Sequence, residues 1–449
     1  MKRTLRSSAA GLQGGAATLV VVMVLFLIMA LLAAYANRSL MFEQRISGSY
    51  YRASMAQEMA EAGIEWTVAM LNGTAIDGSC AAVDTGGTRF VDKYMNVSAV
   101  DRANKSTASD PLGIVADCAR TSAGLVCRCP APNSRGTQPS TASAGSLIPS
   151  VGIALGTDQP ILPVVLTSRR YGNFQVTSDG CSDSSVDTCV AGGAETRSQK
   201  AVGYSKQTAS VAFVAAVPSS PAAPLTVKGV LTTAGAGGLG LHNSDAKSGG
   251  LLVISGGAAA TLDDTRMDSV PGTPPSQAQI FNDSALAAMT GTDGNKKFFW
   301  TFMGMVPSRY ENHPAARTVT CASATSCETE LVAAYAAGKR IVVIDGPMGI
   351  SSNVVIGTIA APMLIIVKGD AQINGPMQLN GMLVVLGGLD WANNAAVASQ
   401  VNGMVVVQGD MHTVGRMDIV YQQSIANELR NRLGSYARIS GGWIDGSTL

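Results

Sequence analysis

Residues 16–36 read AATLVVVMVLFLIMALLAAYA, and this stretch decides the fold of the N-terminal part of the chain. It lies within residues 7–37, which carry no charged side chain. A helix needs about 20 apolar residues to cross the hydrocarbon core of a bilayer. The stretch is therefore long enough to span a membrane as a single helix.

The apolar stretch runs on into an amphipathic one, residues 37–72, which contains no proline. One helix over 16–71 would measure roughly 84 Å at 1.5 Å per residue. Apolar and small side chains recur at three- and four-residue steps on one face: Ile46, Tyr50, Ala53, Ala56, Ala60, Ile64, Thr67 and Leu71. We expect the second half of this face to pack on the protein's own head. Ala53, Ala56, Ala60 and Gly63 would also permit close approach of like helices.

The charges around the span predict its orientation. Lys2, Arg3 and Arg6 precede it, and positive residues are retained in the cytoplasm, so the bulk of the chain should be exported. Two alternatives are a generic single-pass anchor and a cleavable signal peptide, for which Ala34-Tyr35-Ala36 offers a small-x-small site. Signal peptides usually have a shorter apolar region, about 7–15 residues.

Eight cysteines agree with export to an oxidising compartment. Short polar loops separate Cys181 from Cys189 and Cys321 from Cys327, so we predict a disulfide across each loop. Cys80, Cys118, Cys127 and Cys129 permit three pairings, among which the sequence does not choose. No metal site is expected, because Cys127-Arg128-Cys129 lacks the C-x2-C spacing of zinc sites and no histidine is near it.

Length and composition predict an α+β protein of about three units. The chain has 449 residues and a formal net charge of +1, so its charge gives no reason to expect binding to nucleic acid. After the helix, residues 73–217 should form a head with an antiparallel sheet, whose expected strands are 161–167, 173–178, 201–205 and 210–217. Residues 72–147 are expected to be mostly loop. The segment 218–224 contains three prolines and predicts a stiff linker.

Residues 225–449 contain a repeat of apolar strands that end in glycine: VLTTAG at Gly235, LLVISG at Gly256, IVVIDG at Gly346, LIIVKG at Gly369, LVVLG at Gly387 and VVVQG at Gly409. Outside the interval from Gly256 to Gly346, these glycines recur at a spacing of roughly 20 residues, which predicts a β-helix-like (β-solenoid) stack of coils. An antiparallel meander is the alternative, because Asn-Gly turn dipeptides occur at 374, 380 and 402.

An insertion at about 258–339 should interrupt the stack. It has helical character at 276–289 and 328–337. Its aromatic cluster at 298–302 is expected to cover the open edge of the stack, and a surface for a partner is the alternative. The last segment, a helix near 424–432 followed by YARISGGWIDG, is expected to cap the repeats.

The repeats also place four carboxylates near strand ends: Asp345, Asp370, Asp390 and Asp410. Most adjoin glycine in turns, where an aspartate side chain commonly accepts hydrogen bonds from backbone amides. No nucleophile-elbow, P-loop or metalloprotease motif occurs in the chain. We therefore expect no enzymatic activity and no cofactor.

The region from Gly14 to Trp66 resembles the N-terminal region of PilX-type minor pilins of type IV pili. The shared features are the small-residue pair that opens the span, EQRISGSYYR at 43–52 and AQEMAEAGIE at 56–65. Two later segments, GKRIVVIDG at 338–346 and SYARISGGW at 435–443, are similar to segments of the larger PilX-type assembly proteins.

This resemblance implies that residues 1–15 are a prepilin leader. Prepilin peptidase would cut after Gly15, which makes Ala16 the first residue, or after Gly14, and the new first residue would be N-methylated. The resemblance further implies a single-pass inner-membrane protein, with a cytoplasmic N-terminus and a periplasmic bulk, that moves into the surface pilus. Its partners would be the major pilin, other minor pilins, the inner-membrane assembly platform and, as a further candidate, a tip adhesin.

One position differs from the major pilins. These share a glutamate at the fifth residue after the leader is removed, the fifth mature position. Cleavage after Gly15 puts Val20 there. A subunit without this carboxylate cannot form the usual bond to the subunit ahead, which predicts a tip or initiation position and a role in assembly, adhesion or twitching motility. The alternatives are a type II secretion pseudopilin-like tip subunit, which a large β stack argues against, and a membrane-anchored β-helix protein that binds or cleaves polysaccharide.

Overall fold

The computed structural model describes the helix, most of the head and nearly all of the C-terminal half: residues 14–78, 80–95, 97–102, 114–121, 124–128, 160–170, 172–184, 188–189, 193–234, 238–393, 395 and 397–446. The predicted leader, apart from Gly14 and Gly15, and Cys129 lie outside the described residues.

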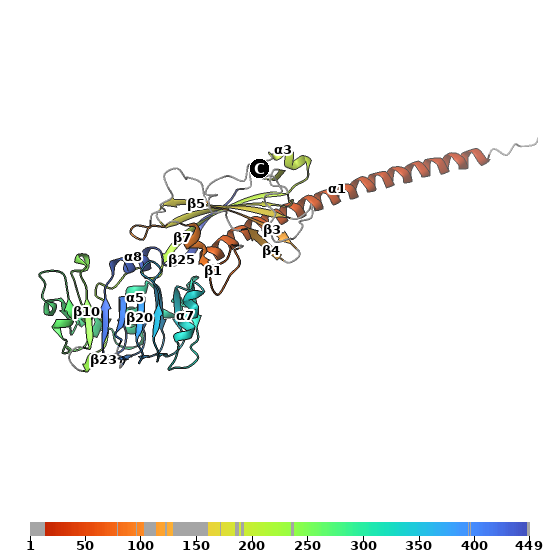
Figure 1. The fold of residues 1–449 in the computed structure, drawn as a ribbon. Helices are drawn as coiled ribbons and strands as arrows, with labels where there is room; N and C mark the ends of the chain where they lie inside the picture. The colour runs from red at the N-terminus through yellow and green to blue at the C-terminus, as the bar shows by residue number, and fades with distance from the viewer. Residues whose placement is uncertain are drawn as a thin grey trace, which may run out of the picture.

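Helix α1 runs from Gly14 to Leu71 as one element of 58 residues. The predicted continuity between the membrane-length stretch and the amphipathic stretch is therefore confirmed. Its first half projects from the rest of the protein as a rod (Figure 1). No proline interrupts this sequence, so every peptide N–H beyond the first turn can join the helical hydrogen-bond ladder.

The second half of α1 lies against an antiparallel sheet of six strands in the order β25-β7-β6-β5-β3-β4. Their bounds are β3 Ile114–Thr121, β4 Gly124–Arg128, β5 Ile161–Arg170, β6 Asn173–Cys181, β7 Tyr204–Ala215 and β25 Gly434–Asp445. Ile64 of α1 is buried with Leu162 and Val176 of the sheet. Around this core lie β1 Ala75–Ile76, β2 Thr88–Arg89, α2 Phe90–Tyr94 and α3 Ala194–Gln199.

The C-terminal half is a stack of parallel strands. The longer sheet follows β12 Met267–Asp268, β10 Leu239–His242, β24 Met417–Val420, β22 Ser399–Val407, β20 Met377–Val385, β18 Met363–Val367, β15 Ile341–Ile344 and β14 Ala316–Val319. A shorter sheet follows β16 Met348–Ile350, β19 Ala371–Ile373, β21 Leu389–Asn393, β23 Met411–Gly415 and β9 Leu231–Ala234. Additional strands are β8 Leu225–Val227, β11 Val253–Ser255, β13 Gln279–Ile280 and β17 Val354–Ile356.

The register of these strands reproduces the predicted repeat from Gly346 to Gly409. Val343 pairs with Ile366, Ile366 with Val384, and Val384 with Val406, all in parallel. Each of these residues lies three positions before the glycine that ends its strand, so the register follows the glycine spacing. Parallel pairing excludes the antiparallel meander for these strands.

The predicted step from Gly235 to Gly256 is wrong. VLTTAG forms β9, whose partner is β23 in the shorter sheet, whereas LLVISG forms β11, whose partners are β8 and β13. These two strands are therefore not equivalent. Moreover, β8, β9 and β10 lie on β22, β23 and β24, so the first coil in sequence stacks on the last one.

Strands in the middle of the longer sheet are buried on both faces, which explains their unbroken apolar sequences. One face fills the interior of the stack, with Val342, Ile365 and Leu383. The other face packs against α5 Gly291–Met303 and α8 Gln423–Asn431. Phe298 and Phe299 are buried in this second layer, so they cover a face of the sheet and not the open edge that the sequence suggested. The remaining helices are α4 Ser284–Ala287, α6 Pro307–Tyr310 and α7 Glu328–Ala336, with short 3₁₀ turns at Ala246–Ser248, Asp264–Arg266 and Pro275–Ala278.

Three further expectations need correction. Strand β25 pairs with β7, so 434–445 completes the head and does not cap the repeats. The stack is thus inserted between two neighbouring strands of the head. The predicted linker 218–224 is packed on the stack, where Ala223 is fully buried and Pro224 accepts a hydrogen bond from Val405. Part of 72–147, predicted as loop, forms β3 and β4.

Candidate assembly interface

The free part of α1 is a continuous exposed surface rich in apolar side chains. Residues 18–47 are all exposed, and the large side chains from Leu19 to Leu32 are each 47–72% exposed. The mean hydropathy of an 18-residue window in this helix is 2.9. Length and composition therefore suit it to cross a membrane.

Such a surface is unstable in water. Covering one large apolar side chain contributes about 1.5–3 kcal/mol, so the whole segment exposes tens of kcal/mol of unfavourable surface. Lipid or other apolar helices must cover it. This exposed apolar surface is consistent with a helix that anchors the protein in a membrane.

The second half of α1 is already occupied by the head. Ala56, Ala60 and Gly63 are buried, so the protein's own sheet uses the small side chains that would otherwise admit a neighbouring helix. A β-carbon built on Gly180 would lie 1.9 Å from the carbonyl oxygen of Ala56, and one built on Gly203 would lie 2.2 Å from that of Arg52. These two glycines let the sheet approach the helix backbone directly.

The amphipathic face predicted from the sequence is divided accordingly. Ala56, Ala60, Ile64, Thr67 and Leu71 are buried against the head, which confirms the expectation for the second half. Ile46 and Tyr50 are 66% and 77% exposed, so they belong to the free surface.

The predicted processing residues lie at the start of this helix. Gly14 and Gly15 are its first two residues and Ala16 is its third. Val20, at the fifth position after Gly15, is 58% exposed on the apolar rod. The structure thus places these residues on one continuous helix, and their processing stays a prediction.

Disulfides lie in both the head and the stack. Cys181 is joined to Cys189 and Cys321 to Cys327, across the two loops that the sequence identifies. Cys118 is joined to Cys127, between the paired strands β3 and β4. Cys80 is also disulfide-bonded.

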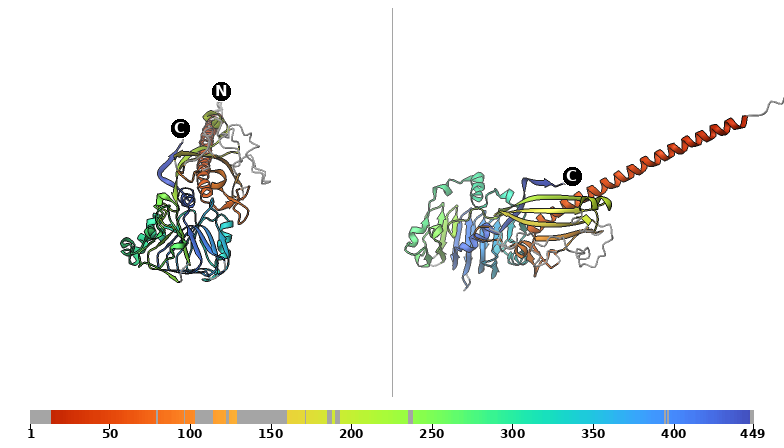
Figure 2. Two further views of the ribbon diagram at one scale, coloured as in Figure 1. Left: turned by 60° about the vertical axis from the view of Figure 1, so that its left-hand side comes forward. Right: turned by 90° about the horizontal axis from the view of Figure 1, so that it is seen from above.

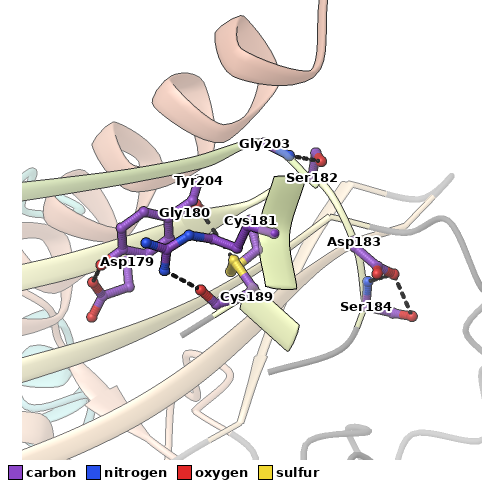
Figure 3. Close-up of a disulfide and its surroundings, with 10 residues drawn as sticks. Asp179, Gly180, Cys181, Ser182, Asp183, Ser184, Cys189, Gly203 and Tyr204 are labelled. Carbon is purple, nitrogen blue, oxygen red and sulfur yellow. Dashed lines mark hydrogen bonds between the residues drawn. A yellow bond between two sulfur atoms is a disulfide. The ribbon is translucent and has the colours of Figure 1, made fainter. Parts of the chain in front are cut away.

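The Cys181–Cys189 bridge lies at the end of the sheet beside α1 (Figure 3). There the Tyr204 hydroxyl donates to Asp179 Oδ1 at 2.6 Å, and the Gly203 N–H donates to Ser182 Oγ at 2.8 Å. Burial and the neighbouring Asp179 carboxylate raise the pKa of the Tyr204 hydroxyl. These contacts hold the end of β6 and the Gly203 segment against the helix.

All four aspartates of the suspected carboxylate ladder have partners. Asp370 Oδ1 accepts from Gly388 N–H and Asp410 Oδ1 from Val230 N–H, both at 2.7 Å. Asp345 lies 2.8 Å from the Lys368 ammonium, and Asp390 lies 3.3 Å from His412 Nδ1. Turn and surface contacts thus account for each carboxylate.

The stack lies beyond the C-terminal end of α1, on the far side of the head from the apolar rod (Figures 1 and 2). Contacts where α1 ends hold it there. The Arg317 guanidinium donates to the Asn72 carbonyl at 2.7 Å, and the Ala75 N–H donates to the Ala337 carbonyl at 2.9 Å. The molecule is therefore elongated along the helix, with apolar and polar ends.

Sequence reasoning missed Gly180, Gly203 and Asn72. Gly180 stands before Cys181 at the end of an expected strand, and an isolated glycine in a strand often marks close backbone approach. Asn72 directly follows the long helix, and asparagine is common where helices end, so its position could have indicated a hydrogen-bonding role there.

Comparison with known proteins supports the N-terminal resemblance. Residues 14–65 match the family described as PilX N-terminal. No curated protein matches the chain. Among solved structures, one match is the crystal structure of competence-associated pilin ComZ from Thermus thermophilus. The two sequences are 7% identical, and the alignment covers 89% of this chain and 96% of that chain, with a TM-score of 0.21. That TM-score is too low to support an argument. The PilX-type resemblance is thus confirmed over residues 14–65.

Proposed function

We propose that this chain, which carries a PilX N-terminal region, is a minor pilin at the tip of a type IV pilus. In this role the apolar half of α1 first anchors the protein in the inner membrane. It then passes into the bundle of helices at the centre of the filament. The exposed rod from Leu19 to Leu32 supports both steps, because lipid and neighbouring helices cover the same apolar surface.

The observation that carries the tip position is the place of the stack. It lies beyond the C-terminal end of α1, opposite the apolar rod (Figure 1). In a filament whose apolar helices point toward the membrane, this space would belong to the subunit ahead. A subunit inside the shaft would have to accommodate residues 225–433 in that space. At the tip the space is free.

Val20 supports the same position independently. A subunit with valine at the fifth mature position has no carboxylate to offer the amino terminus of a subunit ahead. At the tip no subunit is ahead, so the carboxylate has no role. We further propose cleavage after Gly15 by prepilin peptidase, and a role in initiating pilus assembly and in adhesion or twitching motility.

We propose no catalytic activity for the stack. Its four strand-end aspartates hold turns or form ion pairs, and the described residues contain no cluster of three or more metal-ligating side chains. The stack would instead present an outer surface to partners, which include other minor pilins and a tip adhesin.

Electron microscopy of sheared pili tests the position. An epitope inserted after Gly272, in an exposed turn of the stack, should be labelled with gold at filament ends, while antibody to the major pilin labels the shaft. Labelling spread along the shaft would contradict the tip position.

N-terminal sequencing of the same filament-derived protein tests the processing. We expect methylated Ala16 as the first residue. A first residue of Asn37, or recovery from the membrane alone, would contradict the assignment as a pilin and favour a secreted or anchored protein.

A further inference from the structure

The head and the stack meet around a small cleft rich in positive charge. It is lined by residues at the end of α1, by β2, by the chain leading into β15 and by the connection from α8 to β25. Its enclosed part holds about one water molecule, and its mouth opens to solvent. We call it the junction cleft.

Five cationic side chains line the junction cleft: Arg89, Arg317, Lys339, Arg340 and Arg432. Two of them have carboxylate partners. Arg89 binds Asp92 through two hydrogen bonds of 2.8 Å, and Arg432 binds Glu428 at 3.0 Å. Five positive charges thus face two negative ones, in a protein whose formal net charge is only +1.

Arg317 and Arg340 form no ion pair with any described carboxylate. The Arg317 guanidinium donates only to backbone carbonyls, those of Pro314, Ala316 and Asn72. Arg340 donates to the Tyr335 carbonyl and lies 3.9 Å over the Tyr335 ring.

The Nε of Arg340 is buried and has no hydrogen-bond partner. Burial lowers the pKa of both Arg317 and Arg340, which reflects the cost of removing their charge from water. Both side chains are half-buried, and a cation taken out of water without a paired counter-charge is normally destabilising. The cleft therefore holds more positive charge than the described carboxylates beside it, those of Asp92 and Glu428, can balance.

We propose that the junction cleft binds an oxyanion, in which one oxygen enters the enclosed space beside Arg317 and Arg340. A guanidinium group recognises carboxylate, phosphate and sulfate by the same forked hydrogen bonds. The remainder of the anion would lie in the open mouth, near Lys339. This site is independent of the proposed function.

The anion would connect both parts of the protein. Arg89 belongs to the head, Arg317 and Arg340 belong to the stack, and Arg432 lies on the connection between them. An anion that neutralises these groups stabilises their close approach, because it replaces repulsion between cations with charge-assisted hydrogen bonds. It would stiffen the junction between head and stack.

The test uses the full chain in a neutral detergent at pH 7.5. Sodium sulfate and sodium phosphate are titrated against sodium chloride at constant ionic strength, and binding is followed by calorimetry and by the unfolding midpoint. We expect saturable binding and a saturable rise of the midpoint. General stabilisation by sulfate, which is excluded from protein surfaces, does not saturate.

Two variants locate the site. Arg340→Gln should weaken binding by about tenfold or more, because it removes a charge-assisted donor. Arg309→Gln, an exposed arginine on α6 outside the cleft, should bind like the original protein. If Arg340→Gln fails to fold, Lys339→Gln serves in its place. Absence of saturable binding, or an equal response of Arg340→Gln and Arg309→Gln, overturns the proposal.

Sodium acetate separates two sources of the anion. Saturable binding of acetate that Arg340→Gln weakens supports a carboxylate, such as an acidic side chain of a neighbouring subunit. Binding of sulfate or phosphate alone supports a free inorganic anion. Failure of all three salts to bind overturns the site.

Discussion

Asn72 and Tyr436 lie 364 positions apart in the chain and are joined by two buried hydrogen bonds of 2.8 Å. The Asn72 amide donates to the Tyr436 carbonyl and accepts from the Tyr436 N–H, as a neighbouring strand would do. Its own carbonyl accepts from Arg317 of the stack. One residue at the end of α1 therefore joins the helix, the last strand of the head and the stack.

Replacing Asn72 by alanine should lower the free energy of unfolding by about 2–4 kcal/mol, because two buried backbone groups of Tyr436 lose their partners. Thermal unfolding of the detergent-solubilised protein measures the change. Asn312→Ala, which removes one exposed hydrogen bond, is the control and should cost less than about 1 kcal/mol. Equal effects of the two variants would contradict the proposed importance of this contact.

Gly180→Ala should separate the helix from the sheet. The added β-carbon would overlap the Ala56 carbonyl, and relief of such overlap usually costs about 1–3 kcal/mol. Denaturant unfolding, together with protease cleavage after Arg52, measures both stability and local opening. Gly78→Ala is the matched control, since nothing lies within 4 Å of its β-carbon. No added cleavage in Gly180→Ala would show that the helix does not depend on this contact.

His313 should make the protein less stable in acid. It is 5% exposed and stacks on Tyr310, and burial lowers its pKa from 6.5 to about 4. As the pH falls, His313 of the unfolded chain binds a proton near pH 6.5, whereas His313 of the folded protein binds one only near pH 4. The contribution of neutral His313 to the free energy of unfolding is therefore complete above pH 6.5 and is lost as the pH falls toward 4. The loss amounts to about 3 kcal/mol at most. His313→Gln should reduce this pH dependence, and an unchanged slope between pH 6.5 and 4 would contradict it.

His242 should act in the opposite direction. The carboxylates of Asp418 and Asp268 beside its ring raise its pKa above 6.5. Its contribution is therefore complete below pH 6.5 and is lost as the pH rises through the raised pKa. His242→Asn should destabilise the protein more at pH 6 than at pH 8.5. An effect that is equal at both values would exclude a charged His242 in the folded state.

Val20→Glu should reduce the amount of this protein in sheared pili severalfold. At a tip no subunit ahead offers an amino terminus, so the new carboxylate would stay unpaired in an apolar environment. Val20→Leu should be recovered like the original protein, as measured by immunoblot against the major pilin. Undiminished recovery of Val20→Glu would argue for a position within the shaft.

The sequence predicts the parts of this fold that depend on local pattern. The charge-free run at 7–37 and the absence of proline predict α1, and the recurring glycines from Gly346 to Gly409 predict the parallel register of β15, β18, β20 and β22. The partner of each strand is less accessible, because pairing is decided by contacts distant in sequence. Thus β25 follows the repeats directly in sequence, yet it pairs with β7, which lies before the whole stack.

The candidate interface was predictable for the same reason. Leu19 to Leu32 form a local apolar run, so their exposure as a rod follows from composition. The junction cleft was not predictable, because Arg89, Arg317 and Arg432 meet only after both connections between head and stack have formed.

The position of the stack between β7 and β25 has a mechanical consequence. Ala215 and Gly434 are register partners, so the outgoing and returning connections leave the head side by side. Tension on the distal surface is therefore shared by two neighbouring strands, and one proteolytic cut in 218–224 would leave the stack tethered through Gly434. Because Ala215 and Gly434 are neighbours, the stack can be deleted or exchanged as a unit. A short hairpin could join Ala215 to Gly434 while the head keeps all six strands.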